Sequence, residues 1–162
     1  MASTHPIVIR YSAGPAVGLG HHQRCRSLAE ALVDLGAPVH FVAELVAVDP
    51  LPLGPTVPVV PGRPDGLTRY AADVDARAIV YDTYAERPEE LACLSRTAIP
   101  WLKFSWRPSE PCWARWIVAA SPAARVEDYR RVALREDADL LVGPRYAILR
   151  KSLVNRGPPA AM

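Results

Sequence analysis

The segment "VGLGHHQRC", residues 17–25, places two glycines and two histidines directly before a helical pattern. The first turn of a helix presents unpaired N–H groups and a partial positive charge. Gly18 and Gly20 leave the backbone bare there, so an anionic or hydroxyl-rich ligand could approach it. His21 is a candidate general base, because imidazole titrates at about pH 6.5 and accepts a proton at neutral pH. The position also suits a histidine that only fills and hydrogen-bonds the loop.

A second group of polar side chains ends a predicted strand in "YDTYAERPEE", residues 81–90. Asp82 suits either a catalytic carboxylate or a turn residue that accepts hydrogen bonds from backbone amides. Tyr84 offers a hydroxyl and a stacking face beside it. Glu89 and Glu90 suit the first turn of the following helix, where negative charge is favourable.

The glycine pattern departs from the dinucleotide fingerprint, whose third glycine would fall at Gln23. His21 and His22 are adjacent, and adjacent positions on a helix do not easily bring both rings to one metal ion. No histidine and carboxylate cluster has the spacing of metal ligands. We therefore expect neither a metal nor an organic cofactor.

The cysteines and the tryptophans indicate a function less specifically than the histidine motif does. Cys25, Cys93 and Cys112 have no C-x-x-C spacing, which indicates reduced thiols, with Cys25 a small buried helix residue. A dense aromatic group is compatible with core packing, with a platform that stacks on sugars, or with a partner surface. Its members are Trp101, Phe104, Trp106, Trp113 and Trp116.

Strand and helix patterns alternate along the chain and must position these side chains. In the first helix, Leu28, Ala31, Leu32 and Leu35 form an apolar stripe, and Gly36 is its expected C-terminal stop. The expected strands are 6–12, 38–45, 77–82, 100–105, 114–121 and 138–144, and the later helices are 66–75, 85–97 and 126–137. Prolines cluster in residues 49–64, which we expect to be a connecting loop.

This order predicts a single doubly wound α/β domain over residues 1–150, Rossmann-like and with a mostly parallel sheet, followed by a tail at 151–162. Ligands of such folds bind beyond the carboxyl ends of the strands. The loop at residues 12–20 and the loop after Asp82 must both lie at that edge. His21, Asp82 and Tyr84 are therefore expected on one rim.

The overall composition is that of a globular protein, with 162 residues, a formal net charge of +2 and 22% charged residues. So small a charge excludes nucleic acid and an anionic membrane surface as the main partner. The first ten residues lack the features of a signal peptide, and no run of 18 apolar residues occurs. We expect a cytoplasmic protein.

Three segments in order, "VGLGHHQRCRSLAEALVDLGAPVHFV", "YDTYAERPEEL" and "LLVGPRYAILR", resemble the UDP-sugar hydrolases of pseudaminic acid biosynthesis. The match covers most of the chain. The resemblance implies the N-terminal half of a GT-B fold and water attack at the anomeric carbon of a UDP-activated amino or deoxy sugar. It implies His21 as general base and Tyr84 as a second catalytic residue. The candidate substrate-binding residues are Gly18, Gly20, Arg24 and Asp82, and the resemblance leaves two roles open for Arg24, which are to fix the loop or to face the sugar phosphate.

The chain departs from that family in two places. Twelve residues follow Arg150, where the family continues into a second domain that binds most of the nucleotide. A family segment often rich in Asp is replaced by "FSWRPSEPCWARW". A second-domain protein or a homodimer is therefore expected to complete the site. The alternatives are a glycosyltransferase half-subunit and a non-catalytic accessory or binding protein that keeps the fold.

Overall fold

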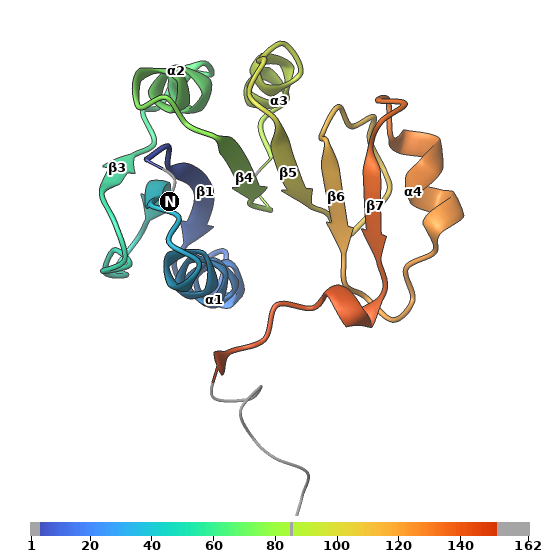
Figure 1. Cartoon of the computed structure of the whole chain (residues 1–162), viewed down its shortest axis with the longest axis horizontal. Helices are drawn as coiled ribbons and strands as arrows, with labels where there is room; N and C mark the ends of the chain where they lie inside the picture. Colours follow the sequence, from blue (N-terminus) through green and yellow to red (C-terminus); the bar gives the residue numbers. More distant parts are fainter. Residues whose placement is uncertain (1–3, 85, 152–162) are drawn as a thin grey trace, which may run out of the picture.

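Seven parallel strands form one sheet in the computed structural model, which describes residues 4–84 and 86–151 (Figure 1). The strands are β1 (Ile7–Ala13), β2 (Val39–Leu45), β3 (Thr56–Pro58), β4 (Ala78–Asp82), β5 (Trp101–Phe104), β6 (Trp116–Ala119) and β7 (Asp139–Val142). The helices are α1 (Gly20–Asp34), α2 (Gly66–Asp73), α3 (Pro88–Leu94) and α4 (Val126–Val132), with a 3₁₀ turn, η1 (Pro144–Tyr146). The predicted α/β class is confirmed.

The strand order is β3-β2-β1-β4-β5-β6-β7, and every pairing is parallel. In chain order, β2 and β3 extend the sheet on one side of β1, and β4 to β7 extend it on the other side. The carboxyl ends of β1 and β4 therefore flank the topological switch point, where loops diverge and leave a crevice. In the register of this pair, Tyr11 lies opposite Asp82.

Helices cover both faces of the sheet, with α1 on one side and α2 and α3 on the other (Figure 1). Because alternate side chains of a strand point to opposite faces, each strand contributes to two cores. Ile9, Phe41 and Cys25 belong to the core under α1. Ile79 and Tyr129 belong to the core under α2, α3 and α4. A sheet whose two faces are both covered by helices is typical of all-parallel α/β folds.

The buried face of α1 agrees with the predicted stripe at Leu28 and Leu32, which pack against the core, and differs from it elsewhere. His21, Cys25 and Ala29 are buried, whereas Leu35 is 82% exposed and Ala31 is also exposed. Cys25 and Ala29 are small, so they let the helix approach the sheet closely. A pattern of apolar residues in the sequence does not reveal this approach. The expected burial of Cys25 is confirmed.

The end of α1 follows the prediction for Gly36. This glycine adopts φ +77°, a conformation that costs other residues free energy. Its N–H donates to the Val33 carbonyl, and the Ala37 N–H donates to the Leu32 carbonyl. These two bonds form a Schellman motif, which satisfies the last carbonyls of the helix.

Several boundaries differ from the expected ones. The proline-rich segment 49–64 contains β3, an edge strand, where Pro58 is tolerated because one side of the strand needs no ladder bond. Helix α3 begins only at Pro88, a favoured first helical position. Helix α4 ends at Val132, because the Leu134 N–H donates to the Cys112 carbonyl and the chain turns extended.

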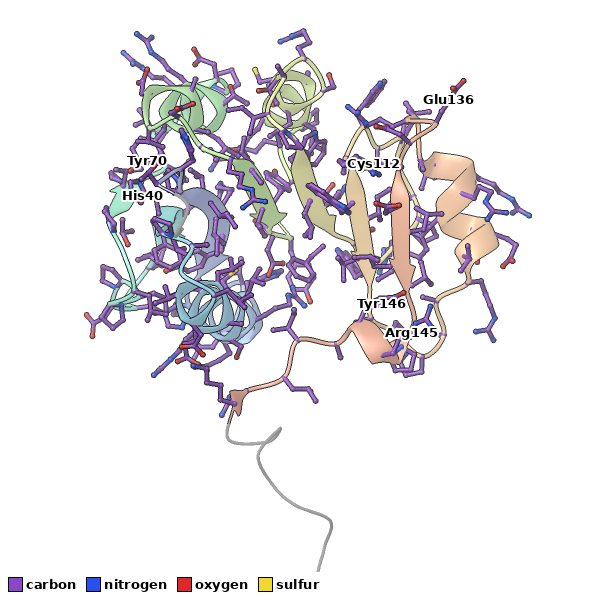
Figure 2. All side chains as sticks on the ribbon, in the orientation of Figure 1. His40, Tyr70, Cys112, Glu136, Arg145 and Tyr146 are labelled. Carbon is purple, nitrogen blue, oxygen red and sulfur yellow. The ribbon has the colours of Figure 1, made fainter. Side chains whose placement is uncertain are left out.

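Side-chain contacts attach the outer elements to the sheet. His40 of β2 and Tyr70 of α2 lie side by side in Figure 2, with 3.0 Å between Nδ1 and the phenol oxygen. Beyond β7, Arg145 lies over the ring of Tyr146 near η1 (Figure 2). Lys151 then pairs with Asp34 at the end of α1. Of the expected tail, residues 152–162 lie outside the described residues.

The segment from η1 to Lys151 covers a part of the sheet that α1 does not reach. Tyr146 and Ile148 pack against the core under α1. Over the described ranges, no helix is both long enough and apolar enough to cross a membrane.

Candidate active site

A cavity of about 390 Å³ opens at the carboxyl ends of β4, β5 and β6, beside the first turn of α1. Five separate stretches of chain line it. These are the start of α1, residues 82–84, residues 104–106 and residues 147–150, together with side chains at the end of β6. The predicted rim therefore exists, and His21, Asp82 and Tyr84 all border it.

His21 and Asp82 form a buried pair on this rim. Nδ1 of His21 lies 2.6 Å from Oδ1 of Asp82, and the two side chains are 2% and 1% exposed. Burial alone would raise the pKa of Asp82, but hydrogen bonds from His21 and Arg24, together with the charge of Arg24, lower it. An ionised carboxylate can only accept, so Nδ1 of His21 carries the proton. In the tautomer that fits this contact, the ring lone pair is on Nε2.

Two further donors from α1 reach the same carboxylate. Arg24 donates from Nε to Oδ2 at 2.7 Å and from Nη2 to Oδ1 at 2.5 Å. The Cys25 thiol donates to Oδ2 at 3.4 Å. Burial, followed by the negative charge of Asp82, raises the pKa of this thiol well above its usual range, so it stays protonated. Asp82 thus accepts hydrogen bonds from three side chains of α1, those of His21, Arg24 and Cys25.

Nε2 of His21 is buried and has no hydrogen-bond partner among residues 4–84 and 86–151. The ring of Tyr84 lies against the imidazole, with 4.0 Å between centroids and an interplanar angle of 77°. Tyr84 is itself 51% exposed. The imidazole that carries this unpartnered nitrogen therefore lies against a partly exposed aromatic ring at the edge of the cavity.

No protein-family model and no curated protein matches this chain.

Aromatic side chains form one wall of the cavity. Tyr84 makes an edge-to-face contact with Trp106 at 5.3 Å, and the guanidinium of Arg107 lies 4.0 Å from the Trp106 ring centroid. Phe104 lines the same wall. Trp101, by contrast, is 4% exposed and belongs to the core. The tryptophan cluster is therefore divided: Trp101 packs in the core, Trp106 lines the cavity, and Trp113 is exposed outside the cavity lining.

The two glycines of the first motif have different positions. Gly20 begins α1 and lines the cavity. Gly18 lies outside the cavity lining, at φ +76°, and its N–H donates to the Gly14 carbonyl at 2.7 Å. It shapes the tight turn that leads into α1. His22 also turns away from the cavity, with Nε2 3.3 Å from the Asp49 carbonyl oxygen.

A second charged cluster, which sequence reasoning missed, lies on the opposite face of the sheet. Arg10 is fully buried in β1 and pairs with Glu90 at 3.3 Å and with Glu44 at 3.5 Å. Tyr81 also donates to Glu90. Glu90 lies in the first turn of α3, as expected, but it is buried there. The sequence did contain a signal for this cluster. Arg10 lies within a strand that is buried on both faces, and a buried arginine requires a partner for its charge.

The described part of the chain contains no group of three or more His, Cys, Asp or Glu side chains that could hold a metal ion. All three cysteines are described, and none forms a disulfide. The polar groups at the site are instead an imidazole, a carboxylate and a guanidinium. This set is suited to moving a proton and to stabilising negative charge.

Proposed function

We propose that the chain carries the proton-accepting half of a sugar-nucleotide hydrolase, with His21 as the general base. The observation that carries this proposal is the unpartnered Nε2 of His21, whose other ring nitrogen is held by Asp82. A buried imidazole with one nitrogen bound to a carboxylate and the other free at a cavity is oriented to accept a proton. The resemblance of three ordered segments to the UDP-sugar hydrolases supplies the reaction class.

In the proposed reaction, a water molecule lies between Nε2 and the anomeric carbon of the sugar. The water oxygen bonds to that carbon while its proton passes to Nε2. The bond between the anomeric carbon and the β-phosphate oxygen breaks, and UDP leaves with the electron pair. The products are UDP and the free sugar, so the step needs no external oxidant or reductant. Asp82 stabilises the imidazolium that forms.

The start of α1 supports the binding of the departing anion. No described side chain caps this helix, and its first turn contains no acidic residue. Its first N–H groups and its dipole therefore favour a negative group in the cavity. Arg150 lines the cavity from the segment after η1 and adds positive charge. Stabilising charge that develops in the transition state is a major source of catalysis.

The aromatic wall supports a sugar ring as the other part of the ligand. Tyr84 and Trp106 expose about half of their surfaces at the cavity mouth. Aromatic faces offer large apolar contacts, with a polar group at the edge of tyrosine and tryptophan. Tyr84 is proposed as a catalytic residue through its contact with the His21 ring.

We also propose that a second lobe or subunit completes the site. Tyr84, Trp106 and Leu149 are each more than half exposed and line one cavity. Such a cluster of exposed apolar side chains is typical of an interface or a ligand site. Most contacts to the nucleotide would then come from that second unit.

The experiment is a hydrolysis assay in ¹⁸O-labelled water with a panel of UDP-activated amino and deoxy sugars. Release of UDP with ¹⁸O in the sugar is the expected result, because attack occurs at the anomeric carbon. His21→Gln is expected to remove the activity, whereas His22→Gln, whose ring turns away from the cavity, serves as the matched control. Label in UDP would indicate attack at phosphorus. Transfer of the sugar to an added acceptor would indicate a glycosyltransferase, and either result would overturn the proposal.

A further inference from the structure

Arg24 contacts the protein with most of its donor atoms. Its Nε and Nη2 bond both oxygens of Asp82, in the forked geometry that matches a guanidinium to a carboxylate. Its Cζ lies 4.9 Å from the ring centroid of Phe104. The guanidinium is therefore held between the end of β4 and the end of β5. Nη1 is the one nitrogen of this group without a partner among the described residues.

The position of Arg24 on α1 explains why it meets Asp82 together with His21. Residues three and four apart on a helix lie on one face. His21, Arg24 and Cys25 therefore point the same way, and all three donate to one carboxylate. Nη2 of Arg24 also lies 3.0 Å from Nδ1 of His21, because both nitrogens are directed at Oδ1.

The charge balance depends on Arg24. Asp82 is 1% exposed, and an ionised carboxylate at that depth is costly unless it is paired and hydrogen-bonded. Burial lowers the pKa of Arg24, but the hydrogen bonds and the negative charge of Asp82 raise it more, so the guanidinium stays charged. The groups that face His21 are Asp82 and Tyr84 from the end of β4 and Arg24 from α1. Arg24 is the cation among them.

We propose that Arg24 is a positioning residue, which fixes the Asp82 carboxylate and through it the His21 ring, and that it does not bind the substrate. The resemblance to the sugar hydrolases left two roles open for this arginine, to fix the loop or to face the sugar phosphate, and the contacts of its guanidinium support a role in holding the site. A lysine cannot replace it, because an ammonium group neither forks over a carboxylate nor lies flat on a ring.

The first test does not depend on any enzymatic activity. In the ¹⁵N-labelled full chain, the Nδ1 proton of His21 is expected to give a ring cross-peak that exchanges slowly with water. Arg24→Met and Arg24→Lys are expected to lose it, while Arg26→Met is expected to keep it. Arg26 is on the same helix and pairs with Glu30 on the exposed side, so it is the matched control. Amide spectra establish whether each variant is folded.

Retention of the cross-peak in a folded Arg24→Met chain would overturn the proposal. Unfolding of both Arg24 variants would overturn it too, since Arg24 would then act on stability rather than on the His21 ring.

The second test is kinetic and rests on the proposed function. With a UDP-sugar that the wild type hydrolyses, Arg24→Lys is expected to lower kcat about 100-fold, the effect of a small misplacement of a reacting group, with KM nearly unchanged. A raised KM with unchanged kcat would make Arg24 a substrate ligand. If the wild type hydrolyses no UDP-sugar, either alone or together with the subunit that completes its site, the proposed function fails, while the spectroscopic test still decides the role of Arg24.

Discussion

Nδ1 of His21 lies 2.6 Å from Oδ1 of Asp82, although 61 positions separate the two residues in the chain. One residue comes from the first turn of α1 and the other from the last position of β4. Parallel pairing of β1 with β4 brings the two ends together. This pair is the origin of the site's chemistry and of several measurable consequences.

Replacement of Asp82 by Asn is expected to reduce sugar-nucleotide hydrolysis by about 10²- to 10⁴-fold, as in other enzymes whose histidine loses its orienting carboxylate. An Asn amide can donate to Nδ1, which would move the ring proton to Nε2 and remove the proton-accepting lone pair. The measurement is kcat for UDP release. Unchanged kcat in Asp82→Asn would show that the pair has no part in the reaction.

Asp82 is also expected to make stability depend on pH at the acid end. Its pKa is lower in the folded chain than its ordinary value of 3.8, owing to the hydrogen bonds from His21 and Arg24 that outweigh burial. The stabilisation is therefore fully present above pH 3.8 and is lost as the pH falls through the lower, folded value. Urea unfolding of wild type and Asp82→Asn at a series of pH values measures it. A difference between the two chains that did not shrink in acid would contradict this assignment.

Tyr84 is expected to protect His21 from chemical modification. Diethyl pyrocarbonate acylates accessible imidazole nitrogens, and Nε2 of His21 is covered whereas His5 is exposed. Peptide mapping by mass spectrometry should therefore show His21 reacting more slowly than His5 in the wild type. Tyr84→Ala should bring the two rates together, while Tyr84→Phe, which keeps the ring, should leave His21 protected. Equal rates for His21 in all three chains would exclude Tyr84 as its cover.

Loss of the Glu90 carboxylate is expected to destabilise the fold. Glu90→Ala would leave Arg10, which is fully buried, with the more distant Glu44 as its remaining carboxylate, and breaking a buried ion pair costs about 3–5 kcal/mol. The free energy of unfolding from urea titration measures the loss. Glu89→Ala is the matched control, because the neighbouring Glu89 is exposed in the same helical turn. Equal stability of the two variants would contradict the role given to the pair.

Much of the fold could be predicted because its signals are local. The β-branched run at β1, the polar residues that end β4 and the glycine that ends α1 each depend on nearby residues alone. The strand β3 could not be predicted, because three residues in a proline-rich segment gain their conformation only by pairing with β2. The buried face of α1 was also wrong in part, since Leu35 projects into solvent. Which side of a helix meets the sheet depends on how closely the backbones pack.

The sequence by itself determined the order of the helices and of every strand except β3, and it placed the glycine and histidine motif and Asp82 at one edge of a parallel sheet. It left open whether Asp82 would act as a catalytic carboxylate, bind the substrate or accept hydrogen bonds in a turn. Only the tertiary structure decided that Asp82 accepts from His21, Arg24 and Cys25 at once, and that Glu90 neutralises Arg10 on the other face. The physical reason is that a hydrogen bond forms only when donor and acceptor lie within a few ångströms of each other. For residues far apart in the sequence, the register of β1 and β4 and the approach of α1 together determine that distance.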